Sequence, residues 1–129
     1  MVDGFRANEV HISEEDWGLL VVLAAPPTED RDFYLMLQRA RDFSESDRKL
    51  GQDKPYIEFC GQGWSWYGHI LSFCLSPASV VVQLDESAAK EMRGDGLIEI
   101  GFDLEKKSFE NFQAALRRVF EGFDYYQEA

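Results

Sequence analysis

The stretch Tyr56–Leu84 reads YIEFCGQGWSWYGHILSFCLSPASVVVQL and contains one formally charged residue, Glu58, together with six of the chain's 18 aromatic residues. A segment with so little charge must lie mostly in a core or an interface, because side chains that face water are mostly polar. Turn signals divide the stretch at Gly61-Gln62-Gly63 and at Ser76-Pro77-Ala78. The three strands predicted between them are Tyr56–Cys60, Tyr67–Leu75 and Ser79–Leu84.

Upstream of this stretch, two further strands and a loop are predicted. The run Gly18–Ala25 is continuously apolar, partly β-branched and stopped by Pro26-Pro27, which predicts a buried strand. The segment Asp32–Arg41 mixes strand-forming and helix-forming residues. We predict a strand there, because its length and aromatic start suit a partner for the preceding run. The polar segment Asp42–Pro55, about 14 residues long, is predicted to be a loop or a mobile lid.

Downstream, the pattern predicts a short helix, a strand and a long helix. Asp85 is suited to cap a helix that runs through Met92 and stops at Gly94. Leu97–Phe102 alternates, which predicts a strand with Glu99 outside. Its core positions are Ile98, Ile100 and Phe102. The last helix has Asp103 or Ser108 as its N-cap, ends at Gly122, and has apolar positions at helical spacing: Phe109, Phe112, Leu116, Val119 and Phe120.

These elements predict an α+β fold in one domain, residues 1–129. We expect a mainly antiparallel β-sheet with the long C-terminal helix packed on one face and a short helix near residues 85–93. A chain of 129 residues with 45% hydrophobic residues buries roughly two-thirds of its unfolded surface, so it needs no metal or disulfide to fold.

The charge excludes several classes of partner. Thirteen Lys and Arg against 24 Asp and Glu give a net charge of −11, which disfavours nucleic acid and anionic membranes, since both bind clustered cations. The longest apolar run has about nine residues, where a membrane span needs roughly twenty. With no visible signal peptide and only two cysteines, the expected location is the cytoplasm.

Two groups of residues resemble metal or catalytic clusters without meeting their requirements. Cys60, His69 and Cys74 lack a fourth zinc ligand and a Cys-x2-Cys spacing, and no basic neighbour lowers the thiol pKa for a Cys–His nucleophilic pair. We expect two small buried thiols and one polar strand residue. The second group consists of His11, Glu14, Glu15 and Asp16. It lacks the spacing of a calcium loop and is predicted to be a solvated turn or helix start. No catalytic residue, cofactor or metal is therefore predicted.

The glycine-framed segment Gly61–Gly68 is the most unusual part of the chain. Trp64, Trp66 and Tyr67 there are predicted either to form an exposed aromatic platform or to close the core over a sheet. Glu58, the lone charge nearby, is either an outward strand residue or a contact to a basic partner.

The order of residues resembles the immunity protein 10 family of bacterial polymorphic toxin systems. The resemblance covers about residues 56–121 and rests on hydrophobic spacing with a few polar marks. The family's usual acidic residue before the glutamine is replaced here by Gly61. The segments that match are Tyr56–Phe59, the turn with Gln62, Tyr67–Ile70, Val80–Val82, Ile98–Leu104 and the helix Phe109–Phe120.

The resemblance implies a small non-enzymatic protein that binds and neutralises a cognate toxin. The net charge of −11 suits a basic target such as a nuclease, and we expect steric blocking with an acidic and aromatic surface. The predicted partner-binding residues are Glu58, Gln62, Trp64, Trp66 and Tyr67. The alternative is a small-ligand or carbohydrate-binding module in which the three rings of the 61–68 loop stack on the ligand. A third hypothesis, an enzyme using Cys60 or His69, is the weakest.

Overall fold

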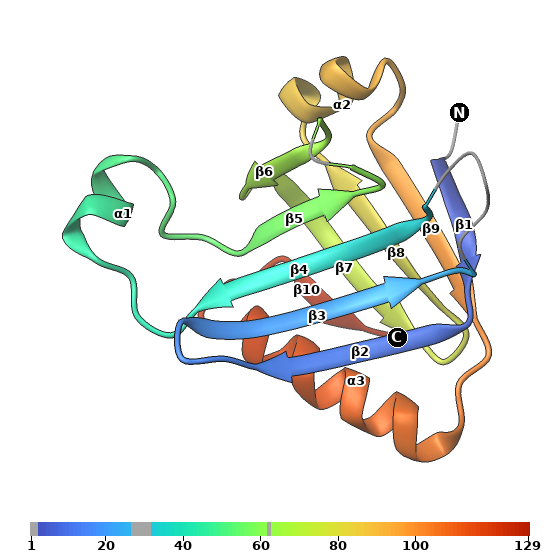
Figure 1. The fold of residues 1–129 in the computed structure, drawn as a ribbon. Coiled ribbons are helices and arrows are strands. Elements are labelled where there is room, and N and C mark those ends of the chain that lie inside the picture. Colours follow the sequence, from blue (N-terminus) through green and yellow to red (C-terminus); the bar gives the residue numbers. More distant parts are fainter. Residues whose placement is uncertain (1–2, 27–31, 62) are drawn as a thin grey trace.

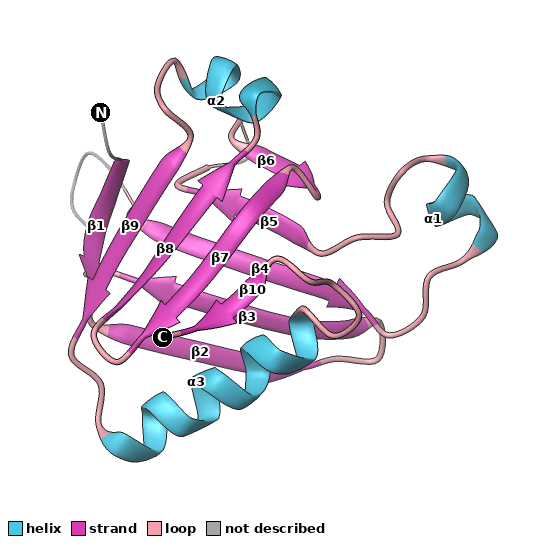
Figure 2. Cartoon of the chain, turned by 180° about the vertical axis from the view of Figure 1, so that it is seen from behind, coloured by secondary structure: helices cyan, strands magenta, loops and turns pink. Residues whose placement is uncertain are grey.

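Two five-stranded sheets face each other in the computed structural model, which describes residues 3–26, 32–61 and 63–129 (Figure 1). The strands of one sheet run obliquely across those of the other (Figure 2). The α+β class is confirmed, but the strands divide between two sheets instead of the one sheet that the sequence predicted.

The first sheet, called here the meander sheet, follows the chain. Each strand pairs antiparallel with the next, so the spatial order is the sequence order. Its strands are β2 (Glu9–Glu14), β3 (Gly18–Ala24), β4 (Tyr34–Ala40), β5 (Tyr56–Phe59) and β6 (Ser65–Tyr67). The predictions of strands at 18–25, 32–41 and 56–60 are therefore confirmed within one or two residues.

The second sheet, called here the mixed sheet, has an antiparallel centre and two parallel edges, in the order β1-β9-β8-β7-β10. The outer strands β1 and β10 run parallel to their neighbours β9 and β7. Its strands are β1 (Asp3–Ala7), β7 (Ile70–Ser76), β8 (Ser79–Leu84), β9 (Leu97–Phe102) and β10 (Tyr126–Glu128).

The inner faces of the two sheets form one hydrophobic core. Along most strands the buried side chains alternate with exposed or half-buried ones, as the two-residue period of a strand requires. Strand β5 is an exception, because its outward residue Glu58 is buried as well. The meander sheet contributes Leu19, Val21, Leu23, Leu35, Leu37, Ile57, Phe59 and Trp66. The mixed sheet contributes Ile70, Phe73, Leu75, Val80, Val82, Leu84, Ile98, Ile100 and Phe102.

Helix α3 (Lys106–Val119) completes this core. It contacts β2, β3 and β4 and lies along the β2 edge of the meander sheet (Figure 2). Its buried positions include Phe112, Leu116 and Val119, so the predicted amphipathic helix is confirmed. The N-cap is Glu105, which makes no side-chain capping bond, and the predictions of Asp103 or Ser108 at this position were wrong.

Two short helices lie in the connections. Helix α2 (Glu86–Met92) begins as predicted, with the Asp85 carboxylate accepting from the backbone N–H of Ala88 at 3.0 Å. It ends at Arg93, whose φ of 58° is left-handed, and not at Gly94. Helix α1 (Glu45–Lys49) interrupts the segment that was predicted to be a loop, and it projects away from the sheets (Figure 1).

The sequence predictions missed strands at both ends of the described chain. The segment at His11–Asp16 was predicted to be a turn or helix start, but β2 extends to Glu14 and only its last residues turn toward β3. The predicted strand Tyr67–Leu75 is in fact the end of β6 and most of β7. The chain passes between the sheets at Gly68 and His69, whose φ values of 77° and 64° are both left-handed.

Candidate functional site

Strand β3 is apolar on both sides, and the described helices and strands cover one of them. Leu19, Val21 and Leu23 are buried in the core, whereas Leu20, Val22 and Ala24 point outward and are half-buried. A strand that is apolar on both faces is typical of one covered on both faces. Within residues 3–26, 32–61 and 63–129, no helix or strand packs over the outward side (Figure 1).

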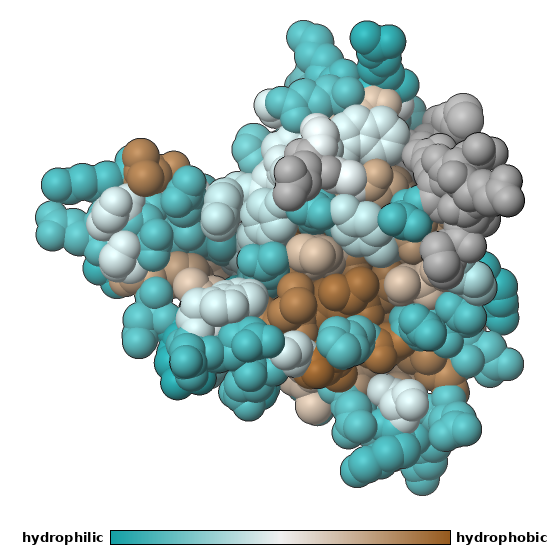
Figure 3. Space-filling model, viewed as in Figure 1, coloured by the Kyte–Doolittle hydropathy of each residue, from teal (hydrophilic) through white to brown (hydrophobic). Residues whose placement is uncertain are grey.

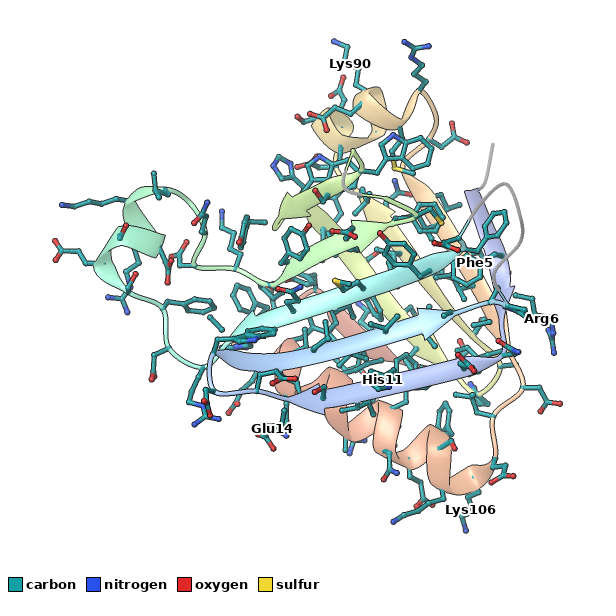
Figure 4. All side chains as sticks on the ribbon, viewed as in Figure 1. Phe5, Arg6, His11, Glu14, Lys90 and Lys106 are labelled. Atoms are coloured by element: carbon teal, nitrogen blue, oxygen red, sulfur yellow. The ribbon has the colours of Figure 1, made fainter. Side chains whose placement is uncertain are left out.

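The outward side chains of the meander sheet form a continuous surface, called here the open sheet face. The strand register aligns His11, Val22, Met36 and Glu58 in one row across four strands. In Figure 3 brown, hydrophobic atoms gather over β3 and β4 on this face, and Figure 4 labels His11 on the strand beside them. The face comprises Glu9, His11, Ser13, Leu20, Val22, Ala24, Tyr34, Met36, Gln38, Tyr56, Glu58, Ser65 and Tyr67.

Glu58 is a buried charged side chain of this face. It is 6% exposed, and both of its carboxylate oxygens accept hydrogen bonds. The hydroxyl of Tyr56 donates to Oε1 at 2.5 Å, and the hydroxyl of Tyr34 donates to Oε2. Burial, followed by these bonds to the carboxylate, raises the pKa of both tyrosines. The two hydroxyls are therefore protonated donors at neutral pH and hold the carboxylate in one orientation.

The open sheet face has negative charge without positive charge among its own side chains. Glu9 and Glu58 are acidic, and no lysine or arginine belongs to the set. The ring of Tyr67, 42% exposed, packs against that of Tyr56 with centroids 5.2 Å apart. The face therefore presents apolar side chains in its middle, with aromatic rings and a fixed carboxylate on β5 and β6.

The structure brings together only two of the predicted partner-binding residues. Glu58 and Tyr67 lie on the open sheet face, whereas Trp66 points to the core and is 8% exposed. Trp64 is half-buried, its ring stacked on Phe59 at 6.1 Å. Because these rings point in different directions, they do not form one continuous stacking platform. Gln62 lies outside the described residues.

The predicted metal and catalytic candidates are distributed over different elements. The two cysteines lie on different elements and are half-buried, not buried as predicted: Cys60 follows β5, and Cys74 lies on β7 in the other sheet. His69 lies in the crossing before β7, and its Nδ1 is 2.8 Å from Oδ2 of Asp85. Among the described residues, no three His, Cys, Asp or Glu side chains are arranged to bind a metal ion. No helix in this part of the chain is long and apolar enough to cross a membrane.

Sequence reasoning missed most of the open sheet face. Tyr34 and Tyr56 were assigned to strands, but their convergence on Glu58 depends on the register of β4 with β5. The apolar character of the face was visible in the run Gly18–Ala25, whose outward residues are as hydrophobic as its buried ones. That run predicted a buried strand, which holds for its inward residues, whereas its outward residues are only half-buried.

Comparison with known proteins gives one match. The family model described as immunity protein 10 matches residues 6–110. The match therefore includes all five strands of the meander sheet and extends N-terminal to residues 56–121, on which the resemblance rested. No curated protein and no solved structure matches the chain significantly. Since the family model covers far more than half of the 129 residues, the chain belongs to the immunity protein 10 family.

Proposed function

We propose that this protein is a non-enzymatic immunity protein that binds a cognate toxin through the open sheet face and neutralises it. Family membership supports the class of function. The single observation that supports the location is the apolar outward side of β3, left uncovered by the described elements. Exposed apolar surface of this kind, flanked by polar and aromatic residues, is typical of protein-binding sites.

Charge supports a basic partner. The net charge of −11 and the absence of lysine and arginine from the open sheet face favour a toxin surface rich in cations. A basic nuclease is the toxin class that fits best, because its nucleic-acid cleft is cationic. Neutralisation is then steric: the bound protein covers the cleft or the surface beside it, and no reaction is needed.

The hairpin turn between β5 and β6 extends this proposed contact. Trp64 belongs to that turn, which joins the paired strands of Glu58 and Tyr67. Gln62 lies outside the described residues and stays a predicted contact. Trp66 supports the contact indirectly, because its burial in the core holds the short strand β6 in place. The proposed contact residues are thus Glu58, Gln62, Trp64 and Tyr67, with the apolar side chains of β3 and β4.

The test begins with the product of the neighbouring open reading frame. Purified protein should bind it in a pull-down assay, and co-expression should restore the growth of cells that express it. If the wild-type protein neither binds this product nor restores growth, the proposal is overturned.

A matched pair of variants tests the location. Val22 and Val81 are both half-buried, outward-facing valines on interior strands, Val22 on the open sheet face and Val81 on the opposite sheet. Val22→Lys places a cation in the apolar centre of the proposed contact and should abolish binding. Val81→Lys makes the same change on the far side and should leave binding intact. Equal binding by both variants would contradict the proposed location.

A further inference from the structure

Glu58 is a nearly buried carboxylate on the open sheet face. Among the described residues, it has two tyrosine hydroxyls as hydrogen-bond partners and forms no ion pair with lysine, arginine or histidine. Removing a charge from water is costly, and buried charges in proteins are normally paired. Nothing in the core requires Glu58, since its side chain belongs to the outward face of β5.

The two hydroxyls leave part of the carboxylate available. Each oxygen accepts one bond from within the protein, from Tyr56 at Oε1 and from Tyr34 at Oε2. A carboxylate has about four acceptor positions, so one remains on each oxygen. Two parallel acceptors side by side match the fork of a guanidinium group.

We propose that Glu58 receives an arginine side chain of the toxin, with Tyr67 flanking the guanidinium group. This inference rests on the proposed function and identifies the chemical group at its centre. Tyr67 lies on the neighbouring strand opposite Tyr56, diagonal to Glu58 on the same face, and is the most exposed tyrosine of the open sheet face. Arginine is favoured over lysine, because its planar group both pairs with two acceptors and stacks on an aromatic ring.

Because its surroundings are apolar, the ion pair between Glu58 and the toxin arginine should slow dissociation of the complex. Met36 lies beside Glu58 on β4, in the register of the sheet, with Val22 next in the row. A toxin surface seated over these side chains would exclude water from the pair and strengthen it. Loss of one partner from such a pair costs about 2–5 kcal/mol of binding free energy. That cost corresponds to a weakening of at least about 30-fold.

The experiment compares Glu58→Gln with Glu99→Gln. Glu99 is an exposed glutamate on the outward side of β9 in the mixed sheet, so the second variant removes the same charge far from the proposed contact. Affinity for the purified toxin is measured for each protein, together with the free energy of unfolding of each unbound protein. We expect Glu58→Gln to bind at least about 30-fold more weakly without losing stability, and Glu99→Gln to bind nearly as the wild type. A purely structural role of Glu58 would lower stability as well.

Toxin variants then test the identity of the partner group. Each surface arginine of the toxin is changed to lysine in turn. One of these changes should weaken binding to the wild-type protein and have little further effect on Glu58→Gln, because both remove the same pair. If Glu58→Gln weakens binding but no arginine shows this coupling, the choice of arginine is overturned.

The outcomes separate this inference from the proposed function. Normal binding by Glu58→Gln together with lost binding by Val22→Lys would overturn the arginine contact and leave the docking surface supported. Normal binding by both variants would overturn both the contact and the surface. A wild-type protein that fails to bind the toxin overturns the proposed function, and the arginine contact with it.

Discussion

The indole nitrogen of Trp66 donates a hydrogen bond to Oε2 of Glu91 at a distance of 2.6 Å. Trp66 lies on β6, the edge strand of the meander sheet, and Glu91 lies on α2, which connects β8 and β9 of the mixed sheet. The bond therefore joins the two sheets at a point where β6 is only three residues long. A hydrogen bond to a charged group is worth about 1.5–3 kcal/mol.

Trp66→Phe should lower the free energy of unfolding by about 1–3 kcal/mol, because the bond to Glu91 and part of the buried indole are lost. Urea unfolding measures this change. Trp17→Phe is the control: its side chain is 47% exposed, and we expect stability to change by less than about 0.5 kcal/mol. The folded Trp66→Phe protein should bind toxin as the wild type does. Weakened binding at unchanged stability would instead make Trp66 a direct contact.

Trp66 and Tyr67 also show the limit of prediction from the sequence. Successive strand residues face opposite sides, so one of the two had to point inward. Which one did so depends on the pairing of β6 with β5, where Trp66 lies opposite buried Ile57 and Tyr67 opposite Tyr56. The sequence identified this segment by its unusual composition but predicted a loop here, with a strand from Tyr67 onward. The direction of each ring follows from the register of the β5–β6 hairpin, which the local pattern does not contain.

The same reasoning explains the elements that were predicted and those that were not. Helix α3 and strand β9 have complete periodic patterns of their own, with Phe112, Leu116 and Ile98 at buried positions, so the local sequence was sufficient. Strands β1 and β10 are parallel edge strands, formed by pairing with β9 and β7. Their segments are short and polar, and only tertiary contacts make them strands.

The tyrosine pair at Glu58 predicts a loss of stability at alkaline pH. Burial raises the pKa of Tyr34 above its usual value, and the hydrogen bond to Glu58 and the charge of that carboxylate add to the effect. In the unfolded chain a tyrosine has a pKa of about 10. The folded state therefore retains a proton that the unfolded state loses, so the contribution to stability is full below about pH 10 and declines as the pH rises further.

We expect the urea midpoint to fall as the pH rises above about 10 and Tyr34→Phe to show a smaller fall. Urea unfolding at several pH values measures both, and ultraviolet absorbance of tyrosinate follows the ionisation itself. Tyr56, Tyr125 and Tyr126 also have raised pKa values, so the variant should reduce the fall without abolishing it. A pH profile identical in the two proteins would contradict an involvement of Tyr34.

Two neighbouring tyrosines near the C-terminus give a matched test of hydrogen bonding. The hydroxyl of Tyr125 is buried and has no hydrogen-bond partner in the described part of the chain, whereas the hydroxyl of Tyr126 donates to Oε2 of Glu128 at 2.8 Å. Both rings pack on Phe120, so replacement by phenylalanine preserves the packing. An unsatisfied buried hydroxyl costs about 1–3 kcal/mol, and a satisfied one contributes about 1 kcal/mol.

Tyr125→Phe should therefore raise the free energy of unfolding by about 1 kcal/mol, and Tyr126→Phe should lower it by a similar amount. Thermal and urea unfolding of the two variants, compared with the wild type, measure the difference. Destabilisation by Tyr125→Phe would show that its hydroxyl has a partner in the folded protein.

The kinetics of toxin binding should separate the effect of net charge from that of Glu58. With a net charge of −11, attraction to a basic toxin can raise the association rate by about 10- to 1,000-fold at low salt. Mobile ions screen this attraction over about 10 Å at moderate ionic strength. A carboxylate buried in the contact is screened much less.

We expect added salt to slow association strongly, and Glu58→Gln to act mainly by accelerating dissociation. Surface plasmon resonance over a range of salt concentrations measures both rates. Glu99→Gln should leave dissociation unchanged, because its exposed carboxylate on the mixed sheet changes only the long-range charge. An association rate independent of salt would contradict the electrostatic attraction, and an unchanged dissociation rate for Glu58→Gln would contradict a buried charge pair.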